Sequence, residues 1–117
     1  MLIRTVVAVS TFVAFSGAAT LADTTGDARA QAEFGIEVAQ KGLWQEAIHR
    51  WKRASDLDPT YAAAWNNLGI AYEHEGLFGK ARDAYEKALE LDPSNNMIQQ
   101  NYDLFREIND RINESDR

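Results

Sequence analysis

The side chains best suited to chemistry in this sequence are two histidines and a pair of neighbouring glutamates. Histidine often acts as a general acid, a general base or a metal ligand near neutral pH. His49 and His74 lie in different segments of the chain, and the sequence contains no cysteine. Glu73 and Glu75 are two positions apart, so on a helix their carboxylates do not face each other. The spacing therefore predicts no catalytic residue, no metal site and no cofactor, and we expect a protein that is not an enzyme.

The segments that carry these residues repeat along the chain. Aligning residues 62–93 with residues 28–59, a shift of 34 positions, gives eleven identical pairs. They include Gly35/Gly69, Gly42/Gly76, Leu43/Leu77, Ala47/Ala81, Ala54/Ala88 and Leu57-Asp58-Pro59/Leu91-Asp92-Pro93. A fixed period of this length is typical of stacked helical repeats.

The repeated residues have helical spacing. Trp65, Leu68 and Tyr72 recur at i, i+3 and i+7, which places them on one face of a helix. Gly35 and Gly69 lie inside helical segments, where a glycine costs about 1 kcal/mol relative to alanine. Because this cost recurs at the same position of both repeats, we expect another helix to pass close by each glycine.

The second repeat resembles the tetratricopeptide repeat (TPR) family. The residues that match the family's two helix patterns, W-x2-L-G-x2-Y and A-x3-F-x2-A-x4-P, are Trp65, Leu68, Gly69, Tyr72, Ala81, Tyr85, Ala88 and Pro93. The first repeat departs from the pattern at Gln31 and Val38, where Trp and Tyr are usual. The resemblance implies an all-α fold, an α-solenoid of TPR helical hairpins, and a function in protein–protein interaction.

The expected organisation is two helix pairs followed by a capping helix. The predicted repeats are residues 28–61 and 62–95, and the predicted capping helix is residues 96–112. Asp103 lies 34 positions after Gly69, and a charged side chain there is incompatible with close packing against a further helix. We therefore expect no third helix pair.

The predicted boundaries follow from glycine, proline and polar residues. Gly42 and Gly76 end the first helix of each repeat, where a left-handed residue fits, and the closing Asp-Pro breaks the second helix. We expect residues 23–27 to form a polar lead-in and residues 113–117 to form a frayed tail.

Residues 1–22 have the composition of an export signal. A single charge at Arg4 is followed by the apolar residues 6–15 and then by small residues up to Ala22. We expect a signal peptide with cleavage after Ala22 and an exported protein, either periplasmic or secreted. A retained membrane anchor is the alternative, but the apolar core is shorter than the roughly 20 residues that a span needs.

The charge of the chain limits its partners. The formal net charge is −6, and the basic residues are scattered along the chain. The densest basic group, residues 50–53, is interrupted by Trp51, which we expect in the core. This balance argues against nucleic acid and against an anionic membrane surface once the signal peptide is removed. The expected partner is therefore a protein or a peptide.

The helix face opposite Trp65 and Tyr72 is the predicted binding site. Ile70 lies on this face, and its equivalents 34 positions away are Ile36 and Leu104. In the TPR family this face forms the concave groove that binds peptides. The predicted groove residues are Ile36, Ala63, Asn66, Asn67, Ile70, Glu73, His74, Asn101 and Leu104. The alternative is that the three aliphatic side chains contact only one another.

The groove composition predicts a neutral or basic partner segment. TPR domains that clamp a C-terminal carboxylate use lysine and arginine beside asparagine, whereas this groove has little positive charge beyond Arg29. Glu73 and Glu107 would repel a carboxylate. We expect a scaffold or assembly factor. The alternatives are a self-associating, homodimeric module and a non-catalytic accessory subunit of an envelope complex.

Overall fold

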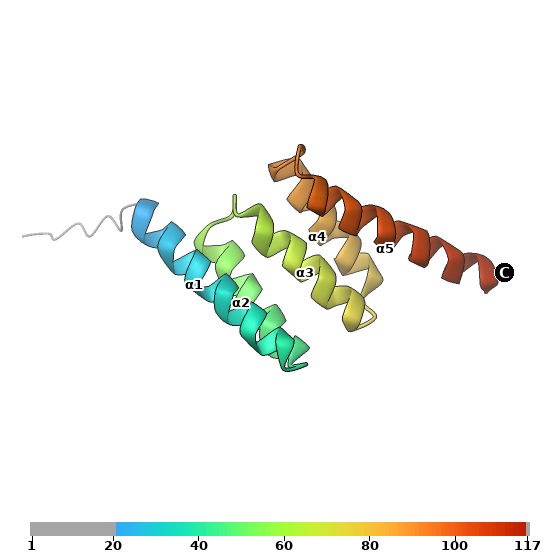
Figure 1. The fold of residues 1–117 in the computed structure, drawn as a ribbon, viewed down its shortest axis with the longest axis horizontal. Helices are drawn as coiled ribbons and strands as arrows, with labels where there is room; N and C mark the ends of the chain where they lie inside the picture. The colour runs from blue at the N-terminus through green and yellow to red at the C-terminus, as the bar shows by residue number, and fades with distance from the viewer. Residues whose placement is uncertain (1–20, 117) are drawn as a thin grey trace, which may run out of the picture.

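The computed structural model describes residues 21–116, which form a stack of α-helices (Figure 1). The five helices of this range are α1 (Leu21–Gln40), α2 (Trp44–Leu57), α3 (Ala62–His74), α4 (Phe78–Leu91) and α5 (Asn96–Ser115). α1 and α2 form one hairpin, α3 and α4 form the second, and α5 packs on the end of the second hairpin. The predicted all-α fold of two helix pairs and a capping helix is confirmed.

Each hairpin turns at a glycine with a left-handed backbone. The φ angles of Gly42 and Gly76 are 76° and 72°, a region that side chains other than glycine rarely adopt. The amide of Leu43 then donates to the carbonyl of Val38 at 3.0 Å, and the amide of Leu77 makes the equivalent bond at 2.8 Å. These bonds satisfy carbonyls that the helix end would otherwise leave unpaired.

The capping helix begins at a side-chain cap. The Oδ1 atom of Asn95 accepts hydrogen bonds from the backbone amides of Met97 at 3.1 Å and Ile98 at 3.2 Å. Asparagine is among the preferred residues at this position because it satisfies amides that have no partner within the helix. The cap fixes where α5 leaves the preceding turn.

An aromatic ring packs against the glycine inside each hairpin. A Cβ atom added at Gly35 would lie 2.4 Å from Nε1 of Trp51, and one added at Gly69 would lie 2.7 Å from the ring of Tyr85. The Nε1 atom of Trp51 also donates to the carbonyl of Ala32 at 3.0 Å. The expected close approach is confirmed, and the group that approaches each glycine is an aromatic side chain of the second helix.

Small and aromatic residues fill the core. The repeated alanines at the helix contacts are fully buried: Ala47, Ala54, Ala81 and Ala88. The largest fully buried side chains are those of Tyr85, Phe105, Leu68 and Ile98. Two of these, Ile98 and Phe105, belong to α5, so the capping helix completes the core of the second hairpin. Trp65, predicted on the core face, is half-buried at its edge, and its indole Nε1 donates to the carbonyl of Pro59 at 3.2 Å.

Two predicted boundaries are wrong. Residues 23–27 are not a lead-in, because α1 already begins at Leu21. The segment contains no proline, and one glycine costs only about 1 kcal/mol in a helix. The predicted capping helix ends at residue 112, but α5 continues to Ser115, because no glycine or proline ends it earlier.

The predicted signal peptide lies outside the described residues, apart from Leu21 and Ala22 at the start of α1. Export therefore stays a prediction. None of the helices within residues 21–116 has the length and apolarity needed to cross a membrane.

Candidate binding groove

The predicted groove residues lie on α1, α3 and α5, the first helices of the successive units. These three helices run in the same general direction through the stack (Figure 1). The structure brings three of the predicted residues together on α3, where Ile70, Glu73 and His74 line a hollow of about 230 Å³. The groove face is therefore hollowed at its centre.

The three aliphatic residues of the predicted groove differ in burial. Ile36 is 43% exposed and Leu104 is 57% exposed, whereas Ile70 is half-buried and packs against the core. Ile70 was expected on the groove and outside the core, but the structure gives it both environments. The exposure of Ile36 and Leu104 favours an open apolar surface over a contact that only joins neighbouring helices.

Glu73 is held in place from the opposite helix of its hairpin. The Tyr85 hydroxyl on α4 donates a hydrogen bond to the Glu73 carboxylate. Burial and this bond raise the pKa of Tyr85 well above its usual range, so the hydroxyl stays protonated and remains a donor at neutral pH. The same tyrosine therefore fills the space beside Gly69 and positions a negative charge at the hollow.

His74 joins the second hairpin to the first. Its ring stacks on the Trp44 ring of α2, with centroids 3.8 Å apart and an interplanar angle of 10°. Beside this stack, Nε2 of Gln45 donates to Oε2 of Glu75 at 2.7 Å. The sequence predicts His74 in the groove but does not predict this stack, because the contact joins side chains of two different hairpins.

Two of the predicted asparagines bond to each other. Asn66 is buried, with 2% of its surface exposed, and its Oδ1 atom accepts from Nδ2 of Asn101 at 3.1 Å. The prediction that Asn66 faces a ligand is therefore wrong: a buried amide needs a partner, and α5 supplies it. Ala63 and Asn67 are half-buried on α3 and remain candidates for a ligand contact.

Two exposed apolar residues of α5 were not among the predicted groove residues. Met97 is 59% exposed and Ile108 is 47% exposed. They lie 34 positions after Ala63 and His74, so the repeat period applied to α5 would have identified both. They extend the apolar part of the groove face along the capping helix.

A larger hollow lies at the turn between α1 and α2. Its volume is about 560 Å³, and its lining is Gly42, Leu43, Trp44, Gln45, Glu46 and Glu75. No predicted groove residue is among these. Repeat proteins bind partners along an extended surface rather than in one deep cavity, so volume alone does not favour this hollow.

No group of three or more acidic or histidine side chains within the described range is arranged to hold a metal ion. His49 is exposed on α2.

Comparisons with known proteins agree with the repeat architecture. A family model described as "Tetratricopeptide repeat" matches residues 62–95, and one described as "TPR repeat" matches residues 37–76. The solved structure of the Arabidopsis OM64 TPR domain is similar to this chain, with a TM-score of 0.70 and 21% sequence identity. The match covers 78% of this chain and 75% of the OM64 TPR domain, which shows a shared fold. The crystal structure of the MamA protein is also similar, with a TM-score of 0.65 and 34% sequence identity. This match covers 73% of this chain and 46% of the MamA chain. No curated protein matches the chain.

Proposed function

The chain belongs to the tetratricopeptide repeat family, whose domains bind protein partners, and we propose that it binds a peptide segment of its partner along α1, α3 and α5. The observation that carries this proposal is the apolar series Ile36, Ile70 and Leu104, one residue from each helix at the repeat period, in which Ile36 and Leu104 are exposed and Ile70 is half-buried between them. Aligned exposed apolar residues mark interaction surfaces, whereas single ones need no explanation.

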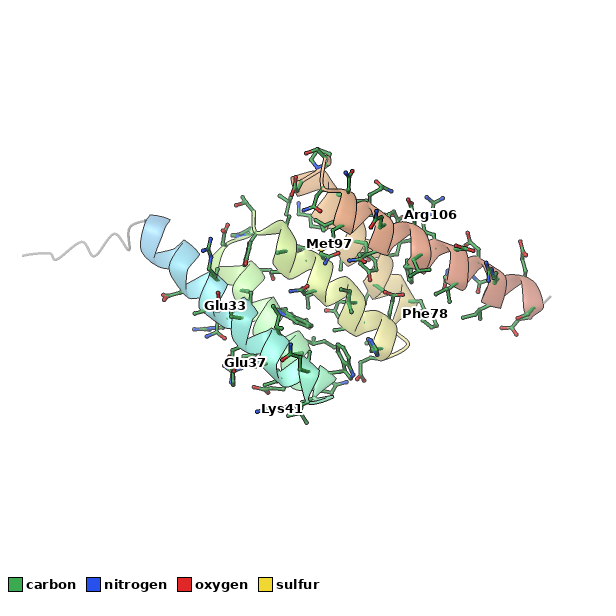
Figure 2. The ribbon with its side chains drawn as sticks, in the orientation of Figure 1. Glu33, Glu37, Lys41, Phe78, Met97 and Arg106 are labelled. Atoms are coloured by element: carbon green, nitrogen blue, oxygen red, sulfur yellow. The ribbon has the colours of Figure 1, made fainter. Side chains whose placement is uncertain are left out.

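The charge of the groove supports a neutral or basic segment. The Glu73 carboxylate lies at the central hollow. Glu33 is exposed on α1 (Figure 2), and Glu107 is exposed on α5, at the positions that correspond to Asn67 and Glu73 of α3. A carboxylate group on the ligand would be repelled by these side chains, and a lysine or arginine would be attracted.

The proposed setting is outside the cytoplasm, in the periplasm or as a secreted protein. The composition of residues 1–22 supports export, and a folded module of this kind would act there as a scaffold or assembly factor. If the chain is an accessory subunit of an envelope complex, the same groove would bind another subunit of that complex.

The test is a crosslinked pull-down with mass spectrometry, followed by a binding measurement with the recovered partner. Ile36→Glu should weaken binding strongly, because it places a charge in an apolar contact, and should leave the melting curve unchanged because the residue is exposed. Leu43→Glu is the matched control, since Leu43 is also exposed but lies at the larger hollow. Loss of binding in Leu43→Glu and not in Ile36→Glu would move the binding site to that turn and overturn the groove proposal.

A further inference from the structure

The hollow on α3 combines an apolar wall with polar groups. Ile70 supplies the apolar side, and Glu73 and His74 supply a carboxylate and an imidazole. Its volume of about 230 Å³ is smaller than the roughly 300 Å³ at which small-molecule pockets begin, so it suits a single side chain. Because α3 lies between α1 and α5 in the stack (Figure 1), a segment bound along all three helices passes over this hollow.

Each side chain that lines the hollow is held by a contact outside it. Ile70 packs against the core. The Oε2 atom of Glu73 accepts the hydrogen bond from the Tyr85 hydroxyl of α4, and the His74 ring stacks on Trp44 of α2. Side chains that are already ordered lose little conformational entropy when a ligand binds, so the hollow is preorganised.

Glu73 differs from the other acidic residue at its repeat position in the state of its charge. Glu107, which lies 34 positions later on α5, is paired with Arg111. Within residues 21–116 the ion pairs are formed by other glutamates, and Glu73 takes part in none of them. The Tyr85 hydroxyl is a neutral donor, so it orients the Glu73 carboxylate without neutralising it.

We propose that Glu73 determines the specificity of the groove by binding a lysine or arginine side chain of the partner segment in this hollow. This inference rests on the proposed function, because the segment must first bind along α1, α3 and α5. The methylene stem of the basic side chain would contact Ile70, and its cationic group would form a charge-assisted hydrogen bond with the Glu73 carboxylate.

Other side chains are disfavoured at the same place. An aspartate or glutamate would meet the negative charge of Glu73 at short range. A leucine would fill the apolar side of the hollow but would remove water from a half-buried carboxylate without replacing its hydrogen bonds. The hollow therefore selects a basic residue by attraction and excludes the alternatives by repulsion and desolvation.

The first test selects binders from a displayed library of random peptides of about twelve residues, long enough to cross the groove. We expect the full chain to enrich sequences with a lysine or arginine at one position among apolar residues. Glu73→Gln should enrich apolar residues without the basic one, and Ile36→Glu should no longer bind the sequences that the parent selects. Parent sequences without a basic residue would overturn this inference and leave the groove in place.

Two other results bear on the proposed function itself. Undiminished binding of the selected sequences by Ile36→Glu would place them outside the groove. A parent chain that enriches no sequence would overturn both the groove and the specificity of Glu73.

The second test measures two synthetic peptides, the most enriched sequence and the same sequence with methionine in place of its basic residue. Glu73→Gln should weaken binding of the basic peptide about tenfold and should change binding of the methionine peptide by less than about twofold. Glu107→Gln is the matched control, because it makes the same substitution at the repeat-equivalent position and should weaken neither peptide. Equal losses in the two variants would show a diffuse effect of charge, and equal losses for the two peptides in Glu73→Gln would show a general effect on the groove. Either result would overturn the proposal.

Discussion

At the scale of single residues, each hairpin is packed around a contact between a glycine and an aromatic ring. In each hairpin an aromatic ring of the second helix lies against a glycine of the first, as Trp51 does at Gly35 and Tyr85 does at Gly69. Tyr85 also reaches the Glu73 carboxylate through its hydroxyl. The residue that packs the hairpin core therefore also orients a charged residue of the proposed groove.

Gly69→Ala tests how tightly this contact is packed. The added Cβ would lie 2.7 Å from the Tyr85 ring, so the helices must separate or the ring must move, at a cost of about 1–3 kcal/mol in the free energy of unfolding. Gly79→Ala is the control, because a Cβ there meets nothing within 4 Å and should stabilise α4 by up to about 1 kcal/mol. Urea unfolding measures both. Equal stability of the two variants would show that the ring moves away without cost.

At the scale of helices, the sequence predicts a helix boundary where glycine or proline interrupts the helix. The ends of α2, α3 and α4 agree with the predicted boundaries within one residue, because glycine or Asp-Pro marks them. The start of α1 was not predicted, since no residue there interrupts a helix. On α5, Ile98, Phe105 and Ile112 recur at a spacing of seven residues, but this periodicity does not show that Ile98 and Phe105 are buried whereas Ile112 is exposed, because burial depends on the helices packed beside α5.

The candidate site shows the same division. The repeat period correctly placed Ile36 and Leu104 on exposed positions. It did not show that Asn66 is buried, because that depends on Asn101 reaching it from another helix. The helical spacing of the sequence identifies the residues that lie on one face of a helix. Contacts between helices determine which of these residues are exposed to solvent.

The unequal burial along α5 gives a prediction for its two halves. Phe105→Ala removes a fully buried side chain and should lower the free energy of unfolding by about 3–5 kcal/mol. Ile112→Ala changes an exposed residue beyond the stack and should change the free energy of unfolding by less than about 0.5 kcal/mol. Denaturant unfolding distinguishes them. A large loss in Ile112→Ala would mean that the end of α5 packs against its own chain.

At the scale of the whole molecule, each unit is joined to the next by a few specific contacts. The Trp44–His74 stack joins the first hairpin to the second, and the hydrogen bond between Asn101 and Asn66 joins α5 to α3. A stack held by nearest-neighbour contacts has a stability that depends on each of these joints. The hairpins, the groove that crosses them and the capping helix therefore act as one unit.

The proposed export signal gives the last prediction, because cleavage after Ala22 would cut close to the folded unit. α1 begins at Leu21, so cleavage removes only its first two residues, and the fully buried side chain of Ala28 stays in place. Fraying at a helix end changes stability little. We therefore expect a chain that begins at Asp23 to have the circular dichroism and melting temperature of the uncleaved protein.

Intact-mass measurement of the exported protein should show that it begins at Asp23. Recovery of a membrane-bound form that retains Met1 would favour the anchor, and a truncated chain that fails to fold would show that residues before Asp23 contribute to the stack.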